Sequence, residues 1–363
     1  MAERDNSDAA AATRMSVGLN YPWAFNKYGL YFGPHPVEPW MDRWLEFFKK
    51  NLIEIDDLGL RVVRIFLLCA GENYGKLPSD KSGFFSPPRH IDPKFLDDLE
   101  KMLAIVRDSG TGIQLIPSLV DFKFFGPTYG NSGSRQVIAR DAAVRDVFFD
   151  SLLDPFLEVG KRYSKQIYAW EVVNEPYWNC CFISPPIYHG PLNILPRLPL
   201  VRARAMREFL EAALRRIEAA GFESTVGHRF YSDLNRWPGG TKPQFHYYAK
   251  RFLWFGDPNP IPDCSETGGA FVGEIDAGLG FGKPWPELGG LDLDPQRRVP
   301  ERLSLLERKG YKLALLWPEN EWTGPANTAR WDQDLEDPLK LTDDAKAGIR
   351  RFTKRAPLSP PLG

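Results

Sequence analysis

Two short apolar runs in this sequence each end in a glutamate. Ile167–Val173 is followed by Asn174 and Glu175, and a second run, Phe271-Val272-Gly273, ends at Glu274. The two glutamates are 99 residues apart (274 − 175). Paired carboxyl groups can divide acid–base work, because one can hold a proton while the other stays ionised. That division requires elements that bring the two side chains together.

Eight short apolar runs are expected to be strands. Runs that are apolar without alternation are typical of parallel strands covered on both faces. The expected strands are Met15–Leu19, Arg61–Leu68, Gly112–Pro117, Ile167–Val173, Ser224–Gly227, Gln244–Tyr248, Ala270–Glu274 and Lys312–Trp317. Helical patterns separate most of them. This alternation predicts an α/β fold, a (β/α)8 TIM barrel with long loops at its C-terminal face.

Helical segments with defined ends are expected around this barrel. Trp40–Asp57 has an apolar stripe and Gly59 as its stop, Asp92 and Thr342 are predicted N-caps, and Pro155 is expected to divide a long helix. The predicted helices are Trp40–Asp57, Pro93–Ser109, Arg140–Tyr163, Pro199–Ala220 and Thr342–Phe352. Segments 234–243 and 249–269 show no helical stripe, so an incomplete outer ring is expected there.

One catalytic domain, residues 15–354, is predicted between two tails, 1–14 and 355–363. The Pro-rich insertion Asn179–Leu198 is too long for an ordinary barrel loop. We expect it to form a wall of the pocket.

The two glutamates lie on the fourth and seventh predicted strands. In a ring of eight, these strands are across the barrel mouth from one another, and chemistry sits at the C-terminal strand ends. Glu175 and Glu274 are therefore expected to face each other, as glycoside hydrolysis requires. Retaining glycosidases hold such carboxyls about 5–5.5 Å apart, and inverting ones about 6.5–9.5 Å.

The motif Trp170-Glu171-x-x-Asn174-Glu175-Pro176 resembles the strand-four signature of clan A (β/α)8 retaining glycoside hydrolases. It is most similar to that of glycoside hydrolase family 5, the cellulase/mannanase family. The resemblance implies that Glu175 is the acid/base. It also implies that Glu274, at the end of strand seven, is the nucleophile.

Further matches to that family follow along the barrel. Arg64 resembles its strand-two arginine, which hydrogen-bonds near the nucleophile, and Trp317 resembles its strand-eight platform under the sugar. His246 and Tyr248 resemble its strand-six His-x-Tyr, in which the tyrosine contacts the nucleophile. One departure is strand three, where the family often has a histidine and this chain has Ile116–Asp121.

Physical roles can be assigned beside the resemblance. Asn174 can donate an amide hydrogen bond to a sugar 2-hydroxyl. A buried Arg64 needs a carboxylate partner, and Glu274 is the natural one, which would keep that carboxylate ionised. A more apolar setting is expected to raise the pKa of Glu175. Glu171, inside the strand, is expected to be a structural ion or hydrogen-bond partner.

Several aromatic residues are expected in loops at the barrel mouth. Trp23, Trp178 and Trp285 are candidates to stack on sugar rings, and core packing is the alternative for each. His228, after the fifth strand, is open to two interpretations: sugar binding or simple loop structure.

Composition excludes several functional classes. The formal net charge is −1, so no nucleic-acid partner is expected. The four cysteines form no CxxC pair or spaced Cys/His set, so a zinc site is not expected. The predicted enzyme is expected to use no metal and no cofactor. No apolar run approaches a membrane span, and the polar N-terminus lacks a signal h-region. A cytoplasmic location is expected, or secretion if a native precursor was trimmed.

The function that these features favour is a retaining β-glycoside hydrolase acting on a β-linked glycan or oligosaccharide, with a glucan or mannan as the first substrate. A β-galactosidase- or xylosidase-like clan A enzyme is one alternative. A carbohydrate-binding barrel without catalysis is another, although both glutamates and their supporting groups are present. A phosphate-binding metabolic barrel is disfavoured, because no clear Gly-rich site follows strands seven and eight.

Overall fold

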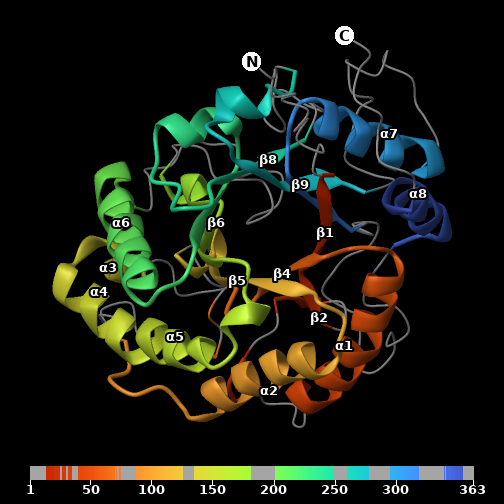
Figure 1. Cartoon of the computed structure of the whole chain (residues 1–363). Coiled ribbons are helices and arrows are strands. Elements are labelled where there is room, and N and C mark those ends of the chain that lie inside the picture. The colour runs from red at the N-terminus through yellow and green to blue at the C-terminus, as the bar shows by residue number, and fades with distance from the viewer. Residues whose placement is uncertain are drawn as a thin grey trace, which may run out of the picture.

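The computed structural model describes residues 14–24, 27–29, 32–34, 40–69, 71, 73–74, 87–125, 135–180, 201–248, 260–277, 295–318, 339 and 341–354. Eight strands in this part of the chain close into a barrel in the order β1-β10-β9-β8-β7-β6-β5-β4. All neighbouring strands are parallel. Helices surround the strands in Figure 1. The predicted (β/α)8 barrel is confirmed.

Every predicted strand overlaps an observed one. The strands are β1 Ser16–Tyr21, β4 Val62–Phe66, β5 Gln114–Asp121, β6 Trp170–Asn174, β7 Ser224–His228, β8 Gln244–Tyr247, β9 Phe271–Asp276 and β10 Leu313–Trp317. The small hairpin of β2 (Trp23–Ala24) and β3 (Lys27–Tyr28) follows β1. Strand β5 runs four residues beyond its predicted end at 117, because Asp121 still pairs with Asn174. That register places both residues at the same end of the barrel.

The helices of the described residues follow the predicted pattern, except that α3 (Gln136–Arg140) and α7 (Pro295–Arg308) were not predicted. They are α1 Trp40–Asp57, α2 Lys94–Asp108, α3 Gln136–Arg140, α4 Ala142–Phe148, the π-helical η2 Phe149–Leu153, α5 Asp154–Lys161, α6 Ala203–Ala219, α7 Pro295–Arg308 and α8 Asp343–Thr353. Helix α1 has its predicted bounds. The predicted long helix is divided into α4, η2 and α5, and Pro155 lies in the first turn of α5, directly after the π-helical segment.

Two N-caps were predicted, and the structure confirms one. Thr342 caps α8, since its hydroxyl accepts the backbone N–H of Ala345. Pro93, rather than Asp92, occupies the cap position of α2. The Asp92 carboxylate accepts the N–H of Lys94 instead, at 2.9 Å.

Helix α7 is absent from the sequence prediction, and prolines at both 295 and 300 explain why its pattern is weak. On the other side, the described segments linking β7, β8 and β9 contain the 3-10 turns η6 (Tyr231–Asn235) and η7 (Cys264–Thr267). The expected gap in the helical ring agrees with this part of the structure. Residues 249–259 lie outside the described part of the chain.

The barrel interior is layered. An apolar cluster fills it near the strand starts, and its members are Val62, Ile116, Phe271, Leu313 and Leu315. Further along the strands the inward side chains are polar and buried, among them Asn20, Arg64, Glu171 and Gln244. A larger apolar core packs between the strands and the helices. The interior therefore changes from apolar to ionic toward the C-terminal strand ends, where barrel enzymes carry their chemistry.

Among the described residues, no helix combines the length and hydropathy that a membrane crossing needs. Several predictions concern residues outside the described part: most of the two tails, most of the insertion Asn179–Leu198, Trp285, and the side chain of Trp23.

Candidate active site

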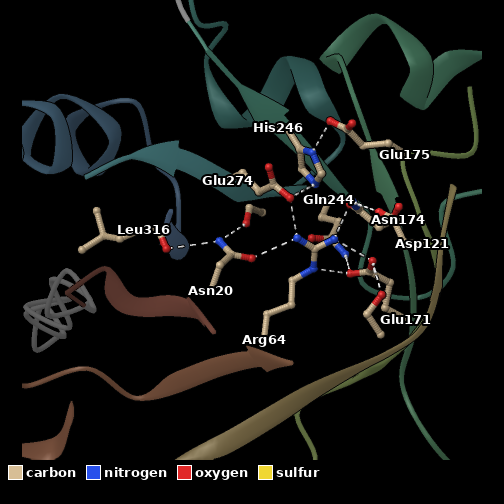
Figure 2. Close-up of polar contacts among 12 residues, drawn as sticks. Asn20, Arg64, Asp121, Glu171, Asn174, Glu175, Gln244, His246, Glu274 and Leu316 are labelled. Atoms are coloured by element: carbon tan, nitrogen blue, oxygen red, sulfur yellow. Dashed lines mark hydrogen bonds and ion pairs between the residues drawn. The ribbon is translucent and has the colours of Figure 1, made fainter. Parts of the chain in front are cut away.

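The two glutamates found in the sequence lie together at the C-terminal ends of β6 and β9. Glu175 immediately follows β6, and Glu274 lies within β9. His246, on β8, lies between them, as Figure 2 shows. Its Nδ1 is 2.9 Å from Glu175 Oε1, and its Nε2 is 3.4 Å from Glu274 Oε1. One atom from each of the three side chains lies within 4.8 Å of the other two.

The backbone at Glu175 has an uncommon conformation. Its φ of 50° and ψ of 51° are left-handed, a region that costs a non-glycine residue about 1–3 kcal/mol. The strand ends here and the chain turns into η4 (Pro176–Asn179). The N–H of Glu175 donates to the Gly227 carbonyl of β7 at 2.8 Å, which ties the turn to the neighbouring strand.

Arg64, on β4, uses all five of its N–H donors inside the barrel (Figure 2). Two of them form a bidentate pair with Glu171, each at 2.6 Å. Another reaches Glu274 Oε1 at 2.6 Å. The remaining two go to amide oxygens, Asn20 Oδ1 at 2.9 Å and Asn174 Oδ1 at 2.6 Å.

The expected pairing of Arg64 with Glu274 is present, but Glu171 takes the larger share of the guanidinium. Burial alone lowers the pKa of Arg64, yet the charges of Glu171 and Glu274 raise it above its ordinary value. Glu171 also accepts from Ser118 Oγ at 2.9 Å and Gln244 Nε2 at 2.6 Å. Burial raises the pKa of Glu171, and Arg64 more than offsets this, so its pKa lies below the ordinary value.

Tyr248 holds the other oxygen of Glu274. Its hydroxyl donates to Glu274 Oε2 at 2.7 Å. Burial and the charge of Glu274 raise the pKa of Tyr248, so the phenol keeps its proton and remains a donor. The carboxylate of Glu274 is thereby held by Arg64 on one oxygen and by Tyr248 on the other.

The directions of the two pKa shifts are opposite to those expected for Glu175 and Glu274. Burial raises the pKa of Glu274, and the nearby charges of His246 and Arg64 do not fully offset this rise. Burial also raises the pKa of Glu175, but hydrogen bonding to His246 lowers it below the ordinary value. The expectation failed because Arg64 is shared with Glu171, and because Glu175 is hydrogen-bonded to Trp178 and His246 rather than surrounded by apolar groups.

Three polar residues that support the site were not predicted from the sequence. Asn20, at the end of β1, donates to the carbonyls of Gly273 at 2.9 Å and Leu316 at 3.2 Å, which joins β1, β9 and β10. Gln244 supports Glu171 as described above, and Asp121 accepts from Asn174 Nδ2 at 2.7 Å. Asn20 and Asp121 could have been identified in the sequence, because each is a polar residue near the C-terminal end of an apolar run.

Asp121 occupies the end of β5, where the resembled family often has a histidine. Its side chain is fully buried, and burial raises its pKa to about 6. One carboxylate oxygen accepts from Asn174, and the other accepts the backbone N–H of Lys123 at 3.0 Å. Asp121 and Arg64 together fix which way the Asn174 amide points.

The remaining candidates take different positions. Trp317 ends β10 half-buried, with its ring edge-on to Phe66 at 6.1 Å. His228 is buried, and burial together with the charge of His246 lowers its pKa to about 4. It hydrogen-bonds the backbone of Pro238, which favours the loop-structure interpretation. Trp178 donates its indole N–H to Glu175 Oε2 at 2.7 Å.

Glu175, His246 and Glu274 also have the residue types of a metal-ion site. The two ring nitrogens of His246, however, face different carboxylates. A single ion bound to one nitrogen would leave the carboxylate on the opposite side of the ring. The arrangement therefore suits a hydrogen-bonded chain better than a coordination sphere.

Removal of the buried negative charge of Glu171 is expected to destabilise the fold. Glu171→Gln leaves Arg64 buried with one carboxylate partner fewer, and the expected loss is about 3–5 kcal/mol in the free energy of unfolding. Because the folded pKa of Glu171 lies below its ordinary 4.5, its contribution is present above that pH and is lost as the pH falls. Urea denaturation should show that the unfolding free energies of wild type and Glu171→Gln differ less at pH 4 than at pH 7. Glu100→Gln, in an exposed pair with Arg162, is the control and should change stability by less than about 0.5 kcal/mol.

Arg64, Glu171 and Asn174, here called the ion cluster, leave no room for a side chain at residue 227. A Cβ there would lie 2.8 Å from Arg64 Nη2 and 3.0 Å from Glu171 Oε1. Gly227→Ala is expected to displace the guanidinium and to cost about 1–3 kcal/mol of stability. Thermal unfolding followed by circular dichroism would test this, and an unchanged melting temperature would show that the cluster tolerates the methyl group.

The fold and the site together define a (β/α)8 barrel with two carboxyl groups at its C-terminal strand ends. No protein-family model matches this sequence, and a search of curated proteins also found no match. Solved structures do match. The β-mannanase of the blue mussel Mytilus edulis has a TM-score of 0.63 and 17% identity, over 94% of this chain and 92% of that one.

Two further neighbours are an endo-1,4-β-mannanase and a GH5_18 enzyme. The mannanase of Eisenia fetida has a TM-score of 0.62 and 16% identity, over 94% of this chain and 91% of that one. The GH5_18 enzyme of Bifidobacterium longum, in complex with Manβ1-4GlcNAc, has a TM-score of 0.54 and 12% identity, over 94% of this chain and 78% of that one. The resemblance noted in the sequence is thus confirmed at the level of the fold.

Proposed function

We propose that this protein is a retaining β-glycoside hydrolase, with Glu175 as the acid/base and Glu274 as the nucleophile. The observation that carries the proposal is the short separation of the two carboxyls, since oxygens of Glu175 and Glu274 lie within 4.8 Å. Inverting enzymes need about 6.5–9.5 Å for an intervening water, whereas retaining enzymes need about 5–5.5 Å. This spacing favours direct attack by one carboxylate on the sugar.

The hydrogen-bond partners of Glu274 suit its proposed role as the nucleophile. Arg64 and Tyr248 hold both oxygens of Glu274, so its attacking oxygen has a fixed direction. In the first step Glu274 bonds to the anomeric carbon while Glu175 gives its proton to the departing oxygen. In the second step Glu175 takes a proton from water, whose oxygen displaces Glu274. Asn174 is the proposed donor to the sugar 2-hydroxyl.

The names of the structural neighbours support a β-mannosidic substrate, and an aromatic side chain supports sugar binding in general. The neighbours are described as β-mannanases, and a GH5_18 neighbour holds the disaccharide Manβ1-4GlcNAc. The site also contains groups suited to sugar recognition, because Trp317 is half-buried near the strand ends. A β-1,4-linked mannosyl oligosaccharide is therefore the substrate to test first.

The experiment is a substrate panel with product analysis. Aryl β-mannosides, β-glucosides, β-galactosides and β-xylosides, together with mannan oligosaccharides and Manβ1-4GlcNAc, are incubated with the protein. The expected result is hydrolysis of mannosides with initial release of the β-anomer. Proton NMR would identify the anomer that is released first. Initial release of the α-anomer would exclude the nucleophilic role of Glu274. Failure on every glycoside, with sugar binding intact by calorimetry, would favour a carbohydrate-binding barrel.

A further inference from the structure

The turn after β6 brings Trp178 back onto Glu175. The two are three positions apart in sequence, and η4 folds them together, with the Trp178 backbone N–H donating to the Glu175 carbonyl at 3.2 Å. The indole Nε1 then donates to Glu175 Oε2 at 2.7 Å. The other oxygen, Oε1, faces His246 Nδ1 at 2.9 Å. Each oxygen of this carboxyl therefore has its own nitrogen neighbour.

Residues from two other strand ends hold the indole ring in place. The guanidinium of Arg229, just after β7, lies 3.7 Å from the ring centroid of Trp178 and 4.2 Å from that of Phe230. Phe122, just after β5, packs against the indole at a tilt, with centroids 6.3 Å apart. These contacts restrict rotation of the indole, so the direction of its N–H is fixed relative to Glu175.

The two nitrogen neighbours of Glu175 differ in chemistry. An indole N–H can donate but cannot accept, whereas an imidazole nitrogen can do either. A protonated Oε2 would be a weaker acceptor for the indole N–H, so the Trp178 bond favours the form of the carboxyl in which Oε2 carries no proton. A proton on Oε1 can be accepted by His246 Nδ1 in the tautomer that leaves this nitrogen without a hydrogen. The two oxygens of this carboxyl are thus not equivalent.

We propose that Trp178 is a positioning residue that assigns the transferable proton of Glu175 to Oε1, the oxygen on the side of His246 and Glu274. This inference rests on the proposed function. In glycosidic cleavage the proton leaves Oε1 for the departing oxygen as its bond to the anomeric carbon breaks. In the hydrolytic step water returns a proton to Oε1 while its oxygen bonds to that carbon and Glu274 is released. Oε2 stays bound to the indole N–H throughout.

The test removes the N–H and keeps the ring. Trp178→Phe retains an aromatic face for Arg229 but cannot donate to Glu175. Its Glu175 carboxyl should titrate at higher pH than in the wild type, because a donor that favours the ionised form is lost. With active substrate, the alkaline limb of kcat/KM should move to higher pH. Hydrolysis of glycosides with poor leaving groups should fall about tenfold, with a smaller loss for dinitrophenyl glycosides.

A matched control and a second variant separate this effect from damage to the fold. Trp170→Phe also removes an indole N–H, on the outer side of β6; that N–H has no hydrogen-bond partner among the described residues. It should leave the titration of Glu175 unchanged. Should Trp178→Phe fold poorly, benzothienylalanine at position 178 keeps the shape of the indole and replaces only the N–H.

One measurement does not depend on hydrolysis. Carbon NMR of protein labelled at the glutamate carboxyls, with Glu175→Gln to assign the signal, follows the titration of Glu175 directly. If the wild type hydrolyses no glycoside, the proposed function fails. The titration of Glu175 in wild type and Trp178→Phe still tests the effect of the Trp178–Glu175 hydrogen bond. An unchanged Glu175 titration in Trp178→Phe would overturn the inference. So would an equal loss on good and poor leaving groups with an unmoved pH profile.

Discussion

Glu274→Ala is expected to reduce kcat for β-mannoside hydrolysis by on the order of 10⁴-fold or more, with a smaller loss of stability than Glu171→Gln. The variant removes the atom that would bond to the anomeric carbon, and loss of a nucleophile in other hydrolases has effects of this size or larger. It also frees Arg64 and Tyr248 from one partner, but the guanidinium keeps its bidentate pair with Glu171. Steady-state kinetics on a dinitrophenyl β-mannoside would measure the loss.

Asp276→Asn is the matched control for this variant. Asp276 is a buried carboxyl on the same strand, 3.5 Å from Arg302, and is not placed in the site. It should keep activity within a few-fold of wild type. A mechanism-based 2-fluoro mannosyl fluoride should also label the peptide that contains Glu274. Comparable turnover by wild type and Glu274→Ala, or labelling of another carboxyl, would remove Glu274 from the nucleophile role.

Glu175→Ala is expected to show a loss that depends on the leaving group. General acid catalysis contributes about 10²–10⁴-fold, so hydrolysis of oligosaccharides should fall by that factor. A dinitrophenyl mannoside needs no protonation to depart, so its first step should be nearly normal and its glycosyl–enzyme should accumulate. Azide, which needs no general base, should then restore turnover and give a β-mannosyl azide.

The measurement is burst kinetics with and without azide, with the product identified by NMR. Equal losses on both kinds of substrate, and no rescue by azide, would show that Glu175 does not act as the acid/base. An α-mannosyl azide would instead indicate a single displacement. Glu175→Gln should give the same leaving-group dependence, since an amide retains the shape but cannot exchange the proton.

The apolar strand runs were predictable because a parallel strand buried on both faces leaves a continuous apolar signature. Helix α1 was predicted to the residue, since its stripe and its terminal Gly59 agree. Helix α7 was not, because prolines at 295 and 300 weaken its pattern and packing must compensate. The network around Arg64 was partly predictable. A charge inside an apolar strand needs partners, but sequence does not say which carboxylate lies nearer.

The unpredicted members of the site show where sequence reasoning ends. Asn20 and Asp121 lie at strand ends, as Asn174 does, yet their roles depend on cross-strand register and on which inward side chains meet. Gln244 became a partner of Glu171 only because β8 and β6 face the same interior. Such contacts join residues 44 to 296 positions apart in the chain.

By itself, the sequence determined the eight strands, their barrel, and the two glutamates at strand ends, because hydrophobic pattern and turn chemistry are local properties of the chain. The tertiary structure decided the separation of the carboxyls, the division of Arg64 between Glu171 and Glu274, and the lowering of the Glu175 pKa below its ordinary value. These depend on distances across the barrel, over which charge and burial act at a few ångströms. The role proposed for Trp178 also depends on the tertiary structure, because a turn directs its N–H at one oxygen of Glu175.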